Sequence, residues 1–376
     1  MQFTATRRGA AALALCAASA LALQGLLSPA AHASASATAP TAHKSPVSTI
    51  ETNVARTFAA SLSSTSWSAQ VRTAALGSKE VSLGALTSQK SVPAGLNSAV
   101  SGADRMIAAA KGLGSDAGSL LRLRLGTQDM RAGLTPSASP LVAAAVGDDS
   151  AATVTAYDSA GRAHTLSARN APDRPVYVID VDVNKAMSEG LAQVDKSLTK
   201  AGLSSPNLVQ PNDGGFWSTK VDSVYLNNDE EPWLLGDAEI FSIVSGFGLD
   251  GKVRVDTVDM PYLDNDHHTY YPNQLLVNWS NYKYNTADVV MMEDDGDTNY
   301  STLAKALADA LLTITDQGAY VPLVDAILAA IPSAWYTNDA DYVDSWYALT
   351  ENSSGTLYGA RGNGQMTVEP YWVSAL

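Results

Sequence analysis

Residues 237–297 of the chain read DAEIFSIVSGFGLDGKVRVDTVDMPYLDNDHHTYYPNQLLVNWSNYKYNTADVVMMEDDGD, and this stretch decides the fold. Short runs rich in β-branched and aromatic residues alternate there with polar loops, as in β-strands joined by turns. With its flanks the stretch predicts strands at 220–226, 237–245, 252–258, 274–279 and 287–292. Helices at 302–314 and 322–331 and closing strands at 343–349 and 365–368 are predicted to follow. We therefore expect an antiparallel β-sandwich with C-terminal helices.

Acidic residues are concentrated in every second loop of this predicted sandwich. Successive antiparallel strands run in opposite directions, so alternate loops emerge at the same end. Loops 227–236, 259–273 and 293–299 share one end, whereas the loops at the other end contain Asp250 as their only acid. The side chains that we expect to gather as metal ligands are Asp229, Glu231, Asp237, Glu239, Asp264, Asp266, Glu293, Asp294, Asp295 and Asp297.

Gathered carboxylates favour a bound cation, because like charges repel and a cation balances them. Calcium takes six to eight oxygen ligands from carboxylates, amides and carbonyls, and the loops supply this mixture. The sequence therefore predicts a calcium site, with the alternative that the loops are solvated acids that keep the protein soluble. The site is not an EF-hand, because Tyr300 occupies the position, counted from Asp295, at which that loop requires glycine.

The first half of the chain predicts a helical and mixed region at 49–206. Ile50, Val54, Phe58 and Leu62 repeat at helical spacing after Thr49, and the helical pattern continues to about residue 125. Further along, a hairpin is predicted at 154–166, a strand at 175–183 and a helix at 185–201. We expect Asp180 and Asp182, which resemble the start of a metal loop, to be capped strand residues instead of ligands. Proline and glycine at 207–219 predict a linker to an acidic β-sandwich domain at 220–376.

Residues 1–33 are predicted to be a signal peptide. Arg7 and Arg8 precede an uncharged apolar stretch, and Ala31-His32-Ala33 fits the small-residue rule for cleavage. Low-complexity sequence follows at once, which favours a cleaved signal over a membrane span and predicts a disordered leader at 34–48. We therefore expect a secreted protein. Cleavage would remove Cys16, the only cysteine, so no disulfide or thiol chemistry is expected.

Charge and aromatic residues are unevenly distributed. Residues 34–219 hold 14 acidic and 16 basic side chains, whereas residues 220–376 hold 24 acidic and six basic ones. Thirteen of the 15 tyrosines also lie in the second half. This break supports two domains, and the acidic half argues against nucleic acid as a partner, because phosphates would be repelled.

The motifs of several enzyme classes are absent. The chain contains no His-Glu-x-x-His and no Gly-x-Ser-x-Gly, so zinc peptidase and serine hydrolase chemistry is not expected. Paired carboxylates that hydrolyse a glycan or another polymer stay open as an alternative. Aromatic residues near the loops predict either a sugar-stacking platform or ordinary core packing. These residues are Trp233, Tyr262, Tyr270, Tyr271, Trp279, Tyr282, Tyr284 and Tyr300.

Several unbroken strings resemble a known family. They include Glu231-Pro232-Trp233-Leu234-Leu235-Gly236-Asp237, Asp259-Met260-Pro261-Tyr262-Leu263-Asp264 and Tyr271-Pro272-Asn273-Gln274. In these the chain is similar to a bacterial secreted family described as a domain of unknown function, numbered 3103. The resemblance implies export and two linked regions. It assigns no activity and no catalytic residues to this chain. The strand and loop pattern also looks like C2-like sandwiches, which is an analogy of architecture only.

The combined expectation is a secreted α+β protein with a helical and mixed N-terminal region and a C2-like antiparallel β-sandwich. Its predicted function is a calcium-stabilised binding or structural module, with an extracellular glycan or protein as the possible ligand. The alternative function is an extracellular hydrolase that uses paired carboxylates.

Overall fold

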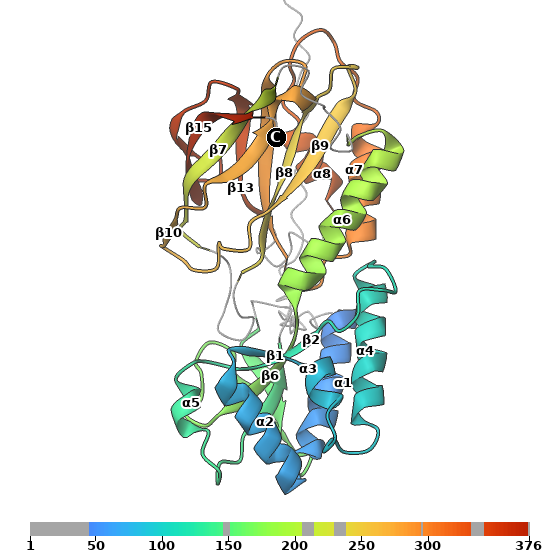
Figure 1. Cartoon of the computed structure of the whole chain (residues 1–376), viewed down its shortest axis with the longest axis vertical. Helices are drawn as coiled ribbons and strands as arrows, with labels where there is room; N and C mark the ends of the chain where they lie inside the picture. The colour runs from blue at the N-terminus through green and yellow to red at the C-terminus, as the bar shows by residue number, and fades with distance from the viewer. Residues whose placement is uncertain are drawn as a thin grey trace, which may run out of the picture. The chain divides into compact units, whose positions relative to one another are not determined.

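The computed structural model describes residues 45–145, 151–204, 214–228, 238–294, 296–331 and 342–374. The predicted signal peptide and residues 34–44 of the predicted leader lie outside this part. The described chain is α+β, with two antiparallel sheets and one mixed sheet, so the predicted α+β class is confirmed (Figure 1). None of the described helices has both the length and the apolar character needed to cross a bilayer.

The first part of the chain is built on a six-stranded sheet in the order β1-β2-β6-β3-β4-β5. Neighbouring strands are antiparallel except β3 and β6, which run parallel. The predicted hairpin is confirmed as β4 and β5, and the predicted strand at 175–183 as β6. The strand bounds are β1 (Glu80–Ser82), β2 (Leu121–Leu125), β3 (Leu141–Ala144), β4 (Thr153–Tyr157), β5 (Ala163–Ser167) and β6 (Val176–Val181).

Helices of this part share one hydrophobic core with the sheet. They are α1 (Pro46–Ser61), α2 (Thr65–Gly77), α3 (Leu83–Thr87), α4 (Leu96–Ala110) and α5 (Met130–Gly133). The first helix begins three residues before the predicted Thr49, because the Ser45 hydroxyl accepts a hydrogen bond from the Ser48 N–H at 3.0 Å and Pro46 is tolerated in a first turn. Residues 46–48 of the predicted leader are therefore helical.

The helical pattern expected up to about residue 125 is wrong at 121–125, because these residues form β2. The sequence LRLRL has period two, which is the period of a strand. Arg122 and Arg124 are nevertheless buried, since both donate to Asp180 of β6, at 3.3 and 3.1 Å. Asp182 caps the next helix by accepting from the Lys185 N–H. Both aspartates thus have structural partners, as we expected for them.

The second part contains two antiparallel sheets that share one core, which we call the two-sheet body. One sheet has the order β10-β7-β15-β14, with β11 also paired to β7, and the other has the order β13-β12-β8-β9. Val224, Val244, Val289 and Met366 are among the core residues that the two sheets contribute. The strands are β7 (Gly215–Leu226), β8 (Ile240–Phe247), β9 (Val253–Asp259), β10 (Thr269–Tyr270), β11 (Gln274–Asn278), β12 (Thr286–Glu293), β13 (Tyr342–Thr350), β14 (Gly355–Tyr358) and β15 (Gly364–Ser374).

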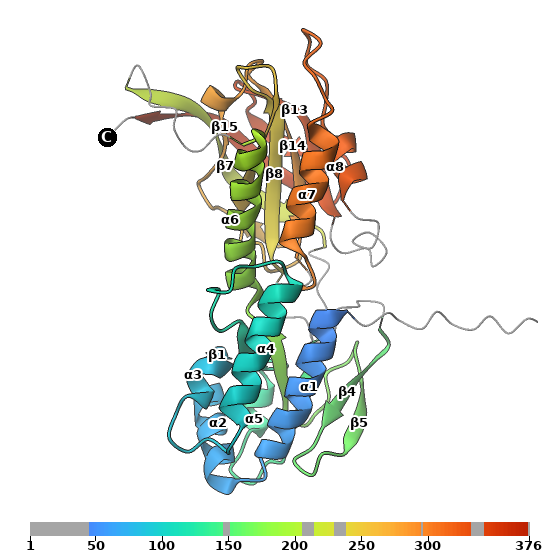
Figure 2. The same ribbon diagram turned by 90° about the vertical axis from the view of Figure 1, so that its right-hand side faces the viewer.

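Three helices cover the other face of the four-stranded sheet (Figures 1 and 2). They are α6 (Val183–Ala201), α7 (Tyr300–Leu311) and α8 (Val324–Ala330). Leu191 and Val194 of α6 join Leu303 of α7 and Val255 of β9 in a second core. The predicted C-terminal helices are therefore confirmed as α7 and α8, and they pack on the sheet as one layer with α6.

Two features of the structure differ from the predicted domain limits. Helix α6, which we placed in the N-terminal region, packs on β9 and α7 of the second part. Strand β7 begins at Gly215, so residues 215–219 of the predicted linker belong to the sheet. Residues 207–213 lie outside the described part, and the division into two domains stays a prediction.

Candidate functional site

The start of β8 and the ends of β9 and β12 lie at the same end of the two-sheet body, as the sequence predicted. In the register of the four-stranded sheet, Phe241 at the start of β8 is paired with Asp259 at the end of β9. Ile240 is likewise paired with Glu293 at the end of β12. The loops that follow β9 and β12 therefore begin beside the residues that precede β8, because β8 is antiparallel to both of these strands.

Four of the ten predicted metal ligands lie outside the described residues: Asp229, Glu231, Asp237 and Asp295. The other six predicted ligands differ in how far they are buried. Glu239, Glu293 and Asp294 are buried, Asp264 and Asp297 are half-buried, and Asp266 is exposed.

Asp294 is neutralised by a lysine. The Lys111 ammonium lies 3.2 Å from Asp294 Oδ1, and both side chains are fully buried. Lys111 also donates to the Gly296 carbonyl at 2.7 Å, while the Gly296 N–H donates to Asp294 Oδ1 at 3.0 Å. The Tyr300 hydroxyl donates to the other carboxylate oxygen. The charge of Asp294 is thus balanced without a metal.

Glu239 faces an arginine. Arg122 Nη2 lies 3.7 Å from Glu239 Oε1, and the Asn184 amide donates to the same oxygen at 3.4 Å. Burial raises the pKa of Glu239 well above its usual range, and the Arg122 guanidinium opposes that rise. The two cations, Lys111 just after α4 and Arg122 in β2, come from far upstream in the chain, so no local pattern in the sequence indicated them.

The remaining acids of the set also have protein contacts. Asp264 accepts a hydrogen bond from the Tyr270 hydroxyl at 2.6 Å, and Asp297 accepts one from the Ser45 hydroxyl at 2.6 Å. In the part of the chain that the structure describes, no three Asp, Glu, His or Cys side chains are grouped so that they could hold a metal. The calcium site stays a prediction that rests on the four ligands outside this part.

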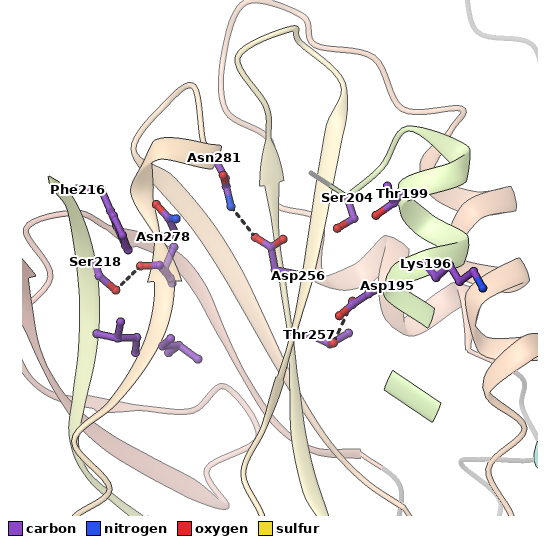
Figure 3. Close-up of a pocket in the computed structure, with 13 residues that line it drawn as sticks. Asp195, Lys196, Thr199, Ser204, Phe216, Ser218, Asp256, Thr257, Asn278 and Asn281 are labelled. Carbon is purple, nitrogen blue, oxygen red and sulfur yellow. Dashed lines mark hydrogen bonds between the residues drawn. The ribbon is translucent and has the colours of Figure 1, made fainter. Parts of the chain in front are cut away.

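A different acidic site lies at the edge of the two-sheet body, and we call it the open-edge pocket. Strand β9 is an edge strand of its sheet, and among the described strands β11 pairs with β7 alone. A pocket of about 340 Å³ opens between β9, β11 and α6 (Figure 3). Its size falls within the usual range of small-molecule sites. The polar residues that line it are Asp195, Lys196, Thr199, Ser204, Ser218, Asp256, Thr257, Asn278 and Asn281.

Two carboxyl groups from different elements line this pocket. Asp195 comes from α6, and its Oδ1 accepts a hydrogen bond from the Thr257 hydroxyl at 3.0 Å (Figure 3). Asp256 comes from β9, and its Oδ2 accepts from the Tyr282 hydroxyl at 2.8 Å and from the Asn281 amide at 3.3 Å. Among the described residues nothing donates a hydrogen bond to the second oxygen of either carboxyl. Each carboxyl is therefore oriented by the protein and keeps one oxygen for a ligand.

The surroundings of the pocket perturb both acids. Burial raises the pKa of Asp195 to about 6; the Thr257 hydrogen bond opposes this rise and the nearby charge of Asp256 adds to it. Burial also raises the pKa of Asp256, against the hydrogen bonds from Tyr282 and Asn281. Two perturbed acids in one concave pocket are typical of a binding or catalytic site.

The two acids of this pocket were not among the predicted site residues, because neither lies in a predicted loop. Asp256 lies inside the predicted strand 252–258, and Asp195 lies inside the predicted helix 185–201 beside the apolar Leu191, Val194 and Leu198. An acid within a regular element that packs against the core was the available signal. The pairing of these two acids required the packing of α6 on β9.

The family described as "Protein of unknown function (DUF3103)" matches residues 52–375. The chain belongs to this family, as the resemblance of its sequence strings predicted. No curated protein and no solved structure matches the chain.

Proposed function

We propose that the protein is a secreted binding module that takes a small polyhydroxylated or amine-bearing ligand in the open-edge pocket. The observation that carries the proposal is the pair of oriented carboxyl groups, Asp195 and Asp256, in one pocket. Both are acceptors when ionised, so they select a ligand that offers O–H or N–H donors.

The rest of the lining supports this choice of ligand. Asn278 and Asn281 offer amide groups that donate and accept, and Thr199 and Ser204 offer hydroxyls. The pocket also contains apolar surface from Phe216 and Leu275. A few placed polar groups on a partly apolar wall are typical of sites that orient a small ligand.

Calorimetric titration with glucosamine and glucose tests the proposal. We expect glucosamine to bind, and its affinity to rise between pH 5 and pH 7 as the Asp195 carboxyl ionises. Asp256→Asn removes a charged acceptor and should weaken glucosamine binding about ten- to a hundredfold. Asp129→Asn, at an exposed aspartate near α5, is the matched control and should change nothing. Equal affinity of the Asp256 variant and the unmodified protein would refute the site.

The same acid pair favours a second candidate function, a hydrolase of glycans or other polymers. One carboxyl that protonates the leaving oxygen and one that activates a water are the groups that glycoside hydrolysis requires. A raised pKa suits the general acid, and Asp195 has one. Reducing-sugar release from soluble polysaccharides tests this function, with Asp195→Asn and Asp256→Asn as variants that should abolish it. Binding of a polysaccharide without release of reducing sugar would favour the binding module over the hydrolase.

Calcium stabilisation and a C2-like architecture belong to the proposal as well. Alternate loops that begin side by side support both, because the ends of β8, β9 and β12 meet. The ligands would come mainly from Asp229, Glu231, Asp237 and Asp295, since Asp294 and Glu239 have cationic partners.

A further inference from the structure

A second hollow lies beside the open-edge pocket, and we call it the tyrosine recess. It measures about 630 Å³ and is lined by Asp259, Pro261, Tyr262, Tyr270, Tyr271, Pro272 and Gln274. Three of its residues belong to the aromatic set that was predicted to be either a sugar platform or core. By contrast Trp279, Tyr282 and Tyr300 of that set are buried and serve the core.

The recess is formed by the segment that connects β9 to β11, the same two strands that line the pocket. Asp256 of β9 lines the pocket and Asp259 of β9 lines the recess, so about 10 Å separates them along the strand. On the opposite side, β11 contributes Asn278 to the pocket and Gln274 to the recess. The Gln274 amide donates to the Asp259 carbonyl at 2.7 Å, which joins β9 to β11 at this point. An elongated ligand along this edge would meet both hollows in turn.

Two of the three tyrosines of the recess are held in place before any ligand arrives. The Tyr262 hydroxyl donates to Gln274 Oε1 at 2.6 Å, and the Tyr270 hydroxyl donates to Asp264 Oδ1 at 2.6 Å. The two rings lie 6.0 Å apart at an angle of 49°. Tyr271 is 72% exposed and is therefore accessible to a ligand. Fixed aromatic faces cost little conformational entropy when a flat apolar surface stacks on them.

The polar groups of the recess select the chemistry of its ligand. Asp259 Oδ1 is buried and has no hydrogen-bond partner among the described residues. A carboxyl group with unused hydrogen-bonding capacity favours a ligand that brings hydroxyl or amine donors to the recess. Sugar rings combine a flat apolar face with many hydroxyl donors. Proline-rich peptides, which also dock in aromatic grooves, have few donors and would leave Asp259 unsatisfied.

We infer that the ligand is an extended glycan, with one unit in the open-edge pocket and the next units stacked on the tyrosine recess. The inference rests on the proposed function for the pocket and adds the polymeric class of the ligand. The acidic lining of both hollows favours a neutral or amine-bearing glycan over an anionic one, because sulfate or uronate groups would be repelled.

A length series tests the inference, with glucosamine and its β-1,4-linked dimer and tetramer as probes in calorimetric titrations. We expect affinity to rise about tenfold or more from monomer to tetramer, because each stacked unit adds a contact. Tyr271→Ala should reduce this gain about three- to tenfold. Tyr358→Ala removes an equally exposed tyrosine, 74% against 72%, from β14 and is the matched control that should keep the full gain.

The outcomes separate the two hollows. A tetramer that binds no tighter than the monomer overturns the recess as a subsite, while loss of monomer binding in Asp256→Asn still supports the pocket. Length dependence that requires Tyr271 but is insensitive to Asp256→Asn overturns the pocket and the continuous path. A ten-residue proline peptide that binds the protein, and loses binding in Tyr271→Ala, overturns the choice of a glycan. Asp259→Asn should lower tetramer affinity while thermal unfolding confirms that the variant folds.

Discussion

Asp195→Asn should stabilise the protein while it weakens the open-edge pocket. The half-buried Asp195 carboxyl has its pKa raised from 3.8 to about 6, chiefly by burial. Between these values the folded state holds more protons than the unfolded state, so the free energy of unfolding decreases as pH rises. The cost of the buried charge is absent below about pH 4 and fully present above about pH 6. The asparagine side chain carries no charge, so Asp195→Asn removes this cost.

The size of the effect follows from the same two values. Raising a pKa from 3.8 to about 6 corresponds to at most about 3 kcal/mol of free energy. The carboxyl is only partly buried, and solvent screens part of its charge, so we expect a gain of about 1 kcal/mol above pH 7. The amide oxygen of asparagine still accepts from Thr257, which keeps the local hydrogen bond. In a chain of 376 residues this gain raises the melting temperature by about 1 to 2 °C.

The assay is urea unfolding and calorimetry of both proteins at pH 4 and pH 8. We expect equal stability at pH 4 and a more stable variant at pH 8, and glucosamine affinity should fall in the same variant. Asp129→Asn serves as the control with the same change of charge at an exposed position. A variant that is less stable at pH 8, or a difference that does not depend on pH, would refute the reasoning.

Three further predictions concern the interior and the loops. Lys111→Met leaves the buried Asp294 carboxylate uncompensated, so urea unfolding should show a loss of about 3 to 5 kcal/mol, and adding Asp294→Asn should restore most of it. Gly190→Ala places a methyl group against the Tyr300 ring and should cost about 1 to 3 kcal/mol in the same measurement, whereas a neutral result would show that α6 and α7 are loosely packed. If the loops bind calcium with a dissociation constant of about 10 μM, 1 mM calcium should stabilise the protein by about 2.7 kcal/mol over chelator. Identical melting in calcium and chelator leaves the loops as solvated acid.

The sequence by itself determined most elements of the second half and the relative direction of its strands. Alternation in 252–258, the apolar run at 287–292, and helical spacing in 185–201 and 302–314 predicted β9, β12, α6 and α7. These patterns are local, because side-chain direction along a strand or helix depends only on backbone period. Because successive strands run in opposite directions, the sequence also predicted which strand ends lie together. The register confirms this for the start of β8 and the ends of β9 and β12.

Only the tertiary structure decided which charges meet. Asp294 stands in an acidic run that predicts a metal, yet its partner is Lys111, 183 residues away. Asp195 and Asp256 carry no shared motif, and the packing of α6 against an edge strand brings both to one pocket. Coulomb energy depends on distance and burial, and neither is encoded by the spacing of residues along the chain. The sequence therefore specified where the acids are attached, and the packing of the helices on the sheets determined which of them a ligand can reach.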